Sequence, residues 1–336
     1  MKAVLDVLGL IGNTPLLKLR RVTDGLDADV YVKCEHLNPS GSIKDRIALR
    51  MVEEAEKEGR LRPGGSIIEQ TSGNTGPALA LVGGVKRYSV RLFIPAQWTG
   101  TYSPEDRIRI MKFFGAEVEP FNLAGYEDIF GDISDEEKAG AIFVVGMKKC
   151  YELERSDPKI WWANQMCNIN NALAHRDTTG GEILEQLEGE VDGWVASIGS
   201  GGTLMGVADA LRKENPSVRV VGVEPTDAPI TEWVRSGMME RFFEAFGVPG
   251  MKLLTETMLE KGLPDEVLTV TDRDAREMAY RLCREEGLFC GISSGANVYA
   301  AIQTAKKLGR GSKVVTVLVD RRDRYFSEHP NEHYVI

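Results

Sequence analysis

The stretch Ser66–Ile94 reads SIIEQTSGNTGPALALVGGVKRYSVRLFI and holds one complete strand–turn–helix–strand unit. Ser66–Glu69 is a short apolar run typical of a strand. A turn rich in glycine and hydroxyl side chains follows it, and the spacing then predicts a helix over 77–85. A second apolar run over 90–94 ends at Pro95. Two short apolar runs on either side of a helix predict parallel strands joined by a crossover helix.

The same alternation runs through most of the chain. Further strands are predicted over 29–33, 194–198, 218–223 and 313–319. Further helices are predicted over 47–58, 104–114, 203–213, 271–286 and 294–308. This order predicts an α/β fold with largely parallel, twisted sheets and helices on both faces. The stretch 121–159 is polar and weakly periodic, so we expect a domain changeover near its end. The stretch 237–264 is expected to be a long loop with short helices.

Composition excludes several classes of protein. The 336 residues include 41 Lys and Arg against 50 Asp and Glu, a net charge of −9, which argues against nucleic-acid binding. Five cysteines, an odd number without a CxxC pair, argue against a disulfide scaffold or a zinc ribbon and favour a cytoplasmic location. The histidines include no HExxH motif, so no metal site is expected. No apolar run approaches the roughly 18 residues of a membrane span.

A lysine lies near the start of a predicted helix in Asn38–Arg46, which reads NPSGSIKDR. Ser40 or Ser42 is placed to cap that helix, which puts Lys44 in its first turn. The positive end of the helix dipole there favours a neutral amine, the form that attacks an aldehyde. The alternative is a solvent-exposed lysine offset by Asp45.

Two turns rich in glycine point to anion binding. Thr71–Gly76, TSGNTG, links a strand to a helix start, and its hydroxyl groups and backbone N–H groups suit a carboxylate. Gly199–Thr203, GSGGT, has the form of a phosphate cradle at a helix N-terminus. Each turn also has a plain structural explanation, a capped turn or a tightly packed glycine turn. Leu204 stands where a Rossmann fingerprint needs glycine, which argues against a nicotinamide-dependent oxidoreductase.

Together these features match one cofactor. Pyridoxal 5'-phosphate has an aldehyde for a lysine, a phosphate for a glycine loop and a ring nitrogen for a side-chain partner. A fourth turn, Gly291–Ala296, reads GISSGA; Ser293 and Ser294 there are by themselves ordinary helix N-caps.

The chain resembles the fold type II pyridoxal-phosphate enzymes, of the cysteine synthase and cystathionine β-synthase family. The motifs that carry the resemblance span nearly the whole chain: Ile11–Leu16, Asn38–Arg46, Thr71–Gly76, His175 with Thr178–Gly180, Gly199–Thr203, Val223–Pro225 and Gly291–Ala296. The resemblance implies a tryptophan synthase β-like fold with a smaller domain over 37–150. The larger domain would comprise 1–36 and 151–336, the cofactor would lie in the cleft between the two, and the chain would form a homodimer.

The resemblance also implies roles for individual residues. Lys44 would carry the cofactor as a Schiff base and later remove the substrate's Cα proton. The phosphate would be held by Gly199, Ser200, Gly201, Gly202 and Thr203. Asn74 would bind the cofactor's 3′-oxygen and Ser293 its ring nitrogen. The substrate carboxylate would be held by Thr71, Ser72, Gly73, Thr75 and Gln165.

The reaction implied is β-replacement on an activated serine, O-acetyl-L-serine or O-phospho-L-serine, through an aminoacrylate. Sulfide as nucleophile would give cysteine. Alternatives are a cystathionine β-synthase, another β-substituted alanine synthase, or a catalytically retired binding protein. The segments 96–107 and 248–258 and the basic run 321–324 depart from the family's usual pattern. Lys252, Arg321 or Arg322 would supply the cations that a phosphorylated donor requires.

Overall fold

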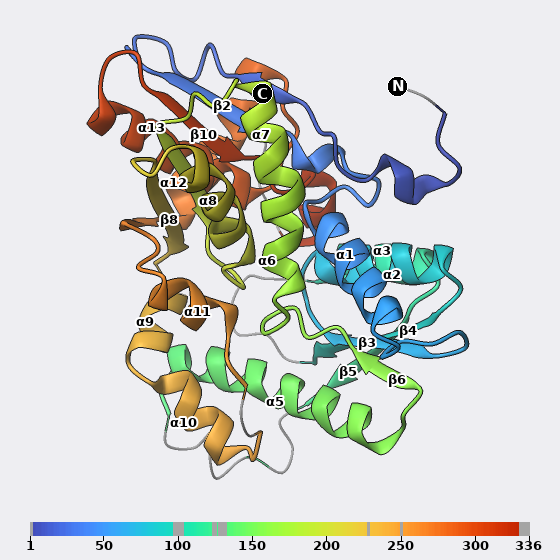
Figure 1. The fold of residues 1–336 in the computed structure, drawn as a ribbon. Helices are drawn as coiled ribbons and strands as arrows, with labels where there is room; N and C mark the ends of the chain where they lie inside the picture. The colour runs from blue at the N-terminus through green and yellow to red at the C-terminus, as the bar shows by residue number, and fades with distance from the viewer. Residues whose placement is uncertain are drawn as a thin grey trace. The chain divides into compact units, whose positions relative to one another are not determined.

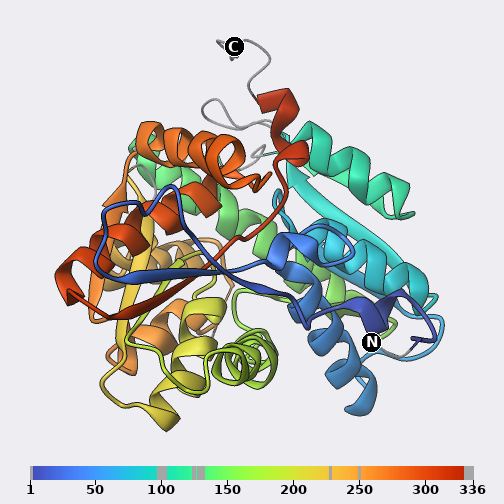
Figure 2. The same ribbon diagram turned by 90° about the horizontal axis from the view of Figure 1, so that it is seen from above.

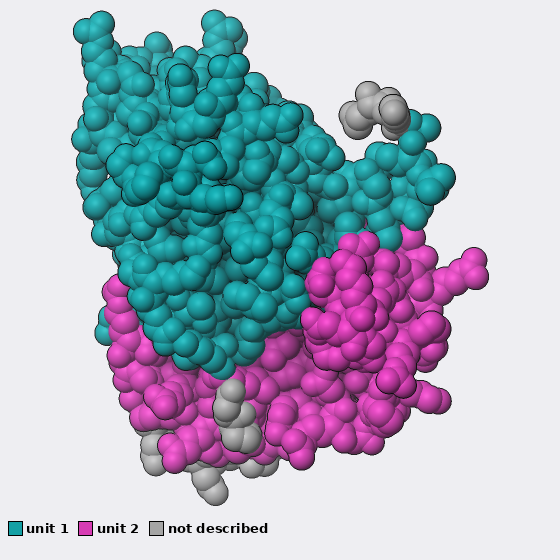
Figure 3. Space-filling model, in the orientation of Figure 1, with its two compact units in different colours: residues 1–51, 165–232, 252–321 teal, residues 52–164, 233–251, 322–336 magenta. Residues whose placement is uncertain are grey.

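The computed structural model describes residues 3–96, 104–122, 126, 133–226, 229–248 and 251–328. The chain divides into two compact units, each made of three segments (Figure 3). Unit 1 comprises residues 1–51, 165–232 and 252–321, and unit 2 comprises residues 52–164, 233–251 and 322–336. Two of the boundaries between the units fall inside helices, one in α1 (Lys44–Lys57) and one in α9 (Ile230–Arg235). The domain limits expected from the sequence, 37–150 against 1–36 and 151–336, stay a prediction.

Unit 1 is built on a six-stranded sheet in the order β1-β2-β10-β7-β8-β9. Its strands are β1 (Leu16–Lys18), β2 (Asp29–Lys33), β7 (Gly193–Ser197), β8 (Arg219–Pro225), β9 (Glu266–Val270) and β10 (Lys313–Val317). β1 pairs antiparallel with β2, and the other pairs are parallel. Figure 2 shows β2 and β10 side by side, although they come from opposite ends of the chain.

Helices bury both faces of this sheet (Figure 1). Successive residues of β7 show the alternation, because Trp194 and Ala196 join one apolar cluster and Val195 joins the other. The helical elements of unit 1, besides α1 and α9, are η1 (Val7–Leu10), η2 (Glu35–Leu37), α6 (Asn170–Ala174), η3 (His175–Gly180), α7 (Gly181–Gln186), α8 (Gly202–Glu214), α11 (Leu254–Glu260), α12 (Asp272–Arg281), η4 (Leu282–Glu286) and α13 (Ile292–Leu308). Residues of α12 and α13 pack on one face, and residues of α8 and α11 on the other.

Unit 2 has a parallel four-stranded sheet in the order β5-β4-β3-β6. Its strands are β3 (Ser66–Gln70), β4 (Ser89–Pro95), β5 (Glu117–Phe121) and β6 (Ile160–Trp162). Its further helical elements are α2 (Thr75–Val85), α3 (Glu105–Phe113), α5 (Asp135–Ser156), α10 (Met238–Ala245) and η5 (Arg322–Glu328). The strand–turn–helix–strand unit of 66–94 forms the centre of this sheet, with β3 pairing β4.

The predicted α/β fold with parallel sheets is confirmed. The strands β1, β5, β6 and β9 and the helical run 170–186 were not predicted, nor was one long helix. The weakly patterned segment 121–159 contains α5, a helix of 22 residues. Its capping box is complete, because Ser134 and Glu137 each accept a hydrogen bond from the other's backbone N–H. The apolar run over 139–147 gives no single stripe, and its two glycines weaken a helix signal.

In the described residues, no helix is long and apolar enough to cross a membrane.

Candidate active site

Lys44 begins α1 in unit 1, and its backbone N–H donates to Ser42 Oγ at 3.3 Å. The turn before it is held by Asp45, whose carboxylate accepts from the backbone N–H of Ser40 at 2.6 Å and also bonds the Ser40 hydroxyl. Burial lowers the pKa of the Lys44 amine to about 8, while the negative charge of Asp320 acts to raise it. The lysine in the first helical turn is therefore confirmed, and burial is the main reason that its amine loses its proton easily.

The loop Gly199–Thr203 links β7 to α8 in the same unit. Gly201 has a φ of +83°, a left-handed conformation that favours glycine. A Cβ on Gly202 would lie 2.1 Å from Asn171 Oδ1, so a larger residue there would displace the Asn171 side chain. Asn171 donates through Nδ2 to Gln165 O at 2.8 Å and to Ser200 Oγ at 2.9 Å. The loop is thus fixed at the N-terminus of α8, where first-turn N–H groups lack an acceptor in their own helix.

His175 connects this loop to the surroundings of Lys44. The buried ring lies with Nε2 3.0 Å from Thr203 Oγ1 and Nδ1 3.0 Å from Thr179 Oγ1. Burial, together with the positive charges of Lys44 and Arg46, holds the pKa of His175 well below its usual value. His175 is therefore neutral and orients the Thr203 hydroxyl. The resemblance marked His175 without a role, because sequence does not show its partners.

The fourth turn starts α13, and its serines are not the N-caps expected from the sequence. Gly291 is the N-cap, so Ser293 and Ser294 lie inside the first turn. The hydroxyl of Ser294 accepts from the backbone N–H of Val319 at 2.9 Å, which ties the helix start to the chain just after β10. Ser293 is half-buried at the same helix start.

Thr71–Thr75 belongs to unit 2 and follows β3. The backbone N–H of Gly73 donates to Thr71 Oγ1 at 3.1 Å, which closes the turn before α2. Asn74 Oδ1 accepts from Arg324, and Ser72 O accepts from Arg107. These two arginines were missed from the sequence, because they lie far along the chain from the loop. The candidate residues thus fall into two groups, one in each unit.

The cations suggested for a phosphorylated donor differ from one another. Lys252 pairs at 2.5 Å with Glu260, and both side chains are exposed. Arg321 is exposed in unit 1, whereas Arg322 is buried in unit 2. Of the atypical segment 96–107, residues 97–103 lie outside the described part of the chain. The role of Lys252 as a cation for a phosphorylated donor stays a prediction, because an ion pair between exposed side chains is weak and leaves the amine accessible.

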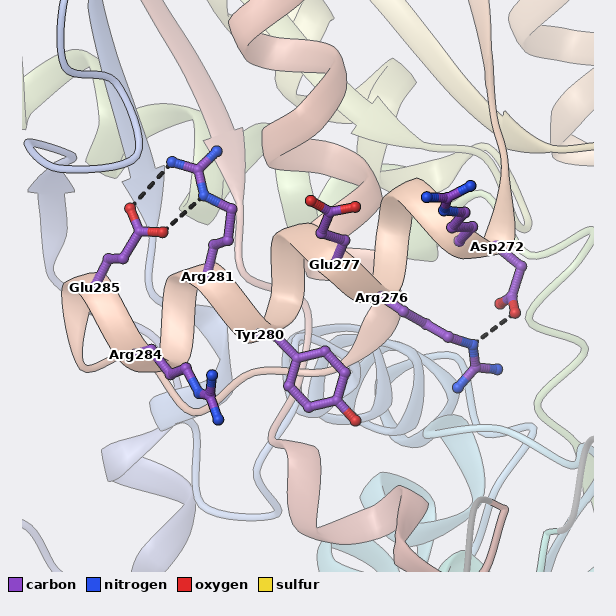
Figure 4. Close-up of a pocket in the computed structure, with 8 residues that line it drawn as sticks. Asp272, Arg276, Glu277, Tyr280, Arg281, Arg284 and Glu285 are labelled. Carbon is purple, nitrogen blue, oxygen red and sulfur yellow. Dashed lines mark hydrogen bonds and ion pairs between the residues drawn. The ribbon is translucent and has the colours of Figure 1, made fainter. Parts of the chain in front are cut away.

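A hollow along α12 is a separate feature (Figure 4). The residues that line it come from α12 and η4, and none is a predicted site residue. Four of its charged side chains form two ion pairs, Arg276 with Asp272 at 2.6 Å and Arg281 with Glu285 at 2.7 Å. This surface is a solvated helix face.

Comparison with known proteins now identifies the family. The family model described as pyridoxal-phosphate dependent enzyme matches residues 7–320. The chain belongs to this family. This pyridoxal-phosphate dependent enzyme is 40% identical to a cysteine synthase from Staphylococcus aureus, over 97% of this chain and 96% of the relative. It is 34% identical to a cystathionine beta-synthase from Rattus norvegicus, over 100% of this chain and 57% of the rat protein.

Similar solved structures support the same family assignment. O-acetyl serine sulfhydrylase isoform 3 from Entamoeba histolytica has a TM-score of 0.79 and 33% identity, covering 98% of this chain and 92% of that one. An O-acetylserine dependent cystathionine beta-synthase from Helicobacter pylori has a TM-score of 0.78 and 30% identity, covering 97% and 98%. These matches confirm the family resemblance, the fold type II architecture and pyridoxal 5'-phosphate as the cofactor.

The residues of unit 1 fit that cofactor. The Lys44 amine has a pKa near 8, which makes the nucleophilic form accessible near neutral pH. At Gly202 a side chain would collide with Asn171, and backbone N–H groups at the start of α8 suit a phosphate. An amine, a phosphate cradle and the Ser293 hydroxyl are the donor set that the cofactor's aldehyde, phosphate and ring nitrogen require.

Proposed function

We propose that the chain catalyses pyridoxal phosphate-dependent β-replacement, in which sulfide replaces the acetoxy group of O-acetyl-L-serine to give L-cysteine and acetate. The observation that carries this function is the Lys44 amine, with a pKa near 8, in the same unit as the fixed glycine loop. Similarity to a cysteine synthase over nearly the whole chain supports the reaction class. Two similar structures named for O-acetylserine support the donor.

When bound, the cofactor withdraws electron density from the substrate's Cα and makes its proton removable. Lys44 Nζ takes that proton, and its lowered pKa suits a base working near neutral pH. Loss of the β-substituent and addition of sulfide then complete the exchange. Water must be kept away during this exchange, because it would compete with sulfide.

We assign the remaining roles by residue type and position. The phosphate is held by the loop Gly199–Thr203, whose Thr203 hydroxyl is oriented by His175. The substrate carboxylate is held by Thr71, Ser72, Gly73, Thr75 and Gln165. Asn74 donates to the cofactor's 3′-oxygen, and Ser293 meets the ring nitrogen. A neutral hydroxyl does not keep that nitrogen protonated as a carboxylate would, which suits short-lived carbanions that expel a β-substituent.

A product assay tests the function and its alternatives. The purified chain is loaded with pyridoxal phosphate and supplied with O-acetylserine or O-phosphoserine, and with sulfide or homocysteine. We expect cysteine from O-acetylserine and sulfide at the highest rate. The Lys44→Ala variant should lose roughly 10²–10⁴-fold in rate, the usual contribution of a positioned base.

Other products would change the assignment. Faster formation of cystathionine from homocysteine would indicate a cystathionine synthase. Faster turnover of O-phosphoserine would reverse the choice of donor. Cofactor binding without any product would indicate a retired binding protein and contradict the proposed function.

We also propose that the chain acts as a cytoplasmic homodimer. The cytoplasmic assignment rests on the cysteines, all five of which are free thiols. Large apolar side chains are exposed near the N-terminus, which favours a partner surface. They are Val4, Leu5, Leu10, Leu17 and Leu37. Light scattering after size-exclusion chromatography should give twice the chain's 37.1 kDa, and a monomer mass would contradict the dimer.

A further inference from the structure

A buried arginine fixes the orientation of Asn74. Arg324 of η5 is 2% exposed, and its Nη1 donates to Asn74 Oδ1 at 2.5 Å. A guanidinium group has donors and no acceptor, so the amide atom that faces it is the oxygen. The orientation of the Asn74 amide is therefore set by the chemistry of its partner. Asn74 consequently directs its Nδ2 donor, rather than its oxygen, away from Arg324.

A second buried arginine holds this arrangement in place. Arg107 of α3 donates through Nε to Ser72 O at 2.9 Å and through Nη1 to Arg324 O at 3.2 Å. Its guanidinium also lies over the Tyr325 ring, 4.8 Å from the centroid. The loop carrying Asn74 and the backbone carrying Arg324 are thus tied to the same side chain.

The other end of η5 is anchored to α3 as well. The Asp106 carboxylate accepts from Ser327 N at 2.6 Å and from Ser327 Oγ at 2.8 Å. All these contacts lie within unit 2. Residues more than 200 positions apart in the sequence therefore form one rigid support for the loop Thr71–Thr75.

We propose that Arg324 is a positioning residue of the cofactor site. It orients the Asn74 amide so that Nδ2 is presented as a donor, and it places a permanent positive charge behind that donor. The proposal rests on the proposed function, in which Asn74 meets the cofactor's 3′-oxygen. A donor backed by a positive charge favours the anionic form of that oxygen over its protonated form.

Removing the guanidinium has two distinct consequences. The amide loses its orienting partner, so its oxygen is able to turn towards the cofactor oxygen and repel it. The positive charge is also lost, so the cofactor oxygen takes up a proton more readily. We therefore expect Arg324→Met to weaken pyridoxal phosphate binding roughly tenfold or more, the usual size for a lost charge-assisted hydrogen bond. The absorption of the bound cofactor should move from the visible towards the near ultraviolet.

Three variants and one control test this role. Arg324→Met removes the guanidinium, and Arg324→Lys keeps a charged donor. Asn74→Asp keeps an acceptor for Arg324 but removes the Nδ2 donor. Arg241→Met, at an arginine of α10 whose side chain is 63% exposed, is the matched control. Each chain is measured for pyridoxal phosphate affinity, for the absorption spectrum of its bound cofactor without substrate, and for thermal stability without cofactor.

The expected pattern separates positioning from simple support. Arg324→Lys should keep most of the visible band, and Arg241→Met should match the wild type. Asn74→Asp should lose the visible band even though it pairs with Arg324 by charge. If Arg324→Met does not fold, the spectra of Arg324→Lys and Asn74→Asp decide the question.

Two results would overturn the proposal. One is an Arg324→Met enzyme with reduced thermal stability but with the wild-type spectrum and affinity. The other is an Asn74→Asp enzyme that keeps both the visible band and the affinity. Failure of the proposed function is recognised separately, because the wild-type chain itself would then bind no pyridoxal phosphate or form no product.

Discussion

His175 shows how a single buried side chain limits its neighbours. A neutral imidazole has one donor and one acceptor nitrogen, and Thr179 and Thr203 hydroxyls lie 3.0 Å from the two. Thr203 also belongs to the loop assigned to the cofactor's phosphate. The Thr203 hydroxyl is thus a hydrogen-bond partner in the core and also part of the proposed phosphate site. Its removal should therefore change both the stability of the chain and the binding of the cofactor.

We expect Thr203→Val to destabilise the chain even without cofactor. The variant leaves a buried ring nitrogen without its partner, which costs about 1–3 kcal/mol in the free energy of unfolding. Urea unfolding of the cofactor-free protein measures this change. Thr203→Ser, which keeps the hydroxyl, is the control and should stay close to the wild type. Equal stability of the valine variant and the wild type would contradict the hydrogen-bond assignment.

The sequence predicted which residues belong to the candidate site better than it predicted what surrounds each of them. The residue spacing correctly predicted that Lys44 lies in the first turn of a helix. The lowered pKa of its amine was, however, ascribed to the helix dipole. Burial is the main cause in the structure. Depth below the surface depends on segments distant in sequence, such as the one that brings Asp320 near Lys44. The support from Arg107 and Arg324 is hidden from the sequence for the same reason.

Among the elements, α12 and α13 approach each other closely through a glycine. A Cβ on Gly295 would lie 2.0 Å from Ala275 O and 2.7 Å from Ala279 N. Backbone atoms cannot move aside as a flexible side chain does. Gly295 of the motif Gly291–Ala296 therefore allows α12 and α13 to pack closely.

Gly295→Ala should destabilise the chain by about 1–3 kcal/mol, the usual cost of overpacking. Gly181→Ala is the matched control, because Gly181 lies in a helix with no atom within 4 Å of the added Cβ. That control should be neutral or stabilising by up to about 1 kcal/mol. Thermal unfolding of both variants measures the difference. Equal melting temperatures for the two variants would show that the helices separate at no cost.

A network of charges joins several elements of unit 1. Glu182 of α7 lies 2.6 Å from Arg46 of α1 and 2.7 Å from Lys33 of β2. Arg46 also pairs with Glu35 at 2.7 Å, and both of those side chains are buried. Burial acts to raise the pKa of Glu182, but the hydrogen bonds and charges of Arg46 and Lys33 outweigh it and lower the pKa to about 2.

This lowered pKa predicts a dependence of stability on pH. The unfolded value is 4.5, so the stability from Glu182 is present above about pH 4.5 and is lost as the pH falls towards 2. Glu182→Gln removes this titration. We expect its unfolding free energy to fall less steeply than that of the wild type between about pH 5 and 3. Parallel pH profiles for the two proteins would contradict the assignment.

Most helices and strands were predictable because their apolar spacing is regular. The turn and helix starts at Lys44, Thr271 and Gly202 follow ordinary capping and glycine rules. Thr271 is the N-cap of α12, and its hydroxyl accepts from Asp274 N at 3.1 Å. The longest element that was not predicted is α5, whose residues are buried on more than one side, among them Ala141, Val144, Val145 and Cys150. A helix that is buried on several sides has no single apolar stripe, and that stripe is the pattern by which a helix is recognised in a sequence.

At the scale of the whole molecule, the alternation of strands and helices predicted parallel sheets with helices on both faces. It did not show that each unit is assembled from three separate segments, since that depends on contacts between residues far apart in sequence. The sheet of unit 1 places β10, near the C-terminus, between β2 and β7. Topology of this kind follows from long-range pairing and not from local patterns.

The central claim is that Lys44 works with pyridoxal phosphate on O-acetylserine. Its most direct test is an absorption titration of the cofactor-loaded chain with O-acetylserine, run beside Lys44→Ala. We predict a visible cofactor band in the wild type that changes on adding O-acetylserine and returns on adding sulfide, as cysteine is released. The Lys44→Ala variant should lack that cycle. A wild-type chain that shows no cofactor band, or a band that O-acetylserine leaves unchanged, would contradict the claim.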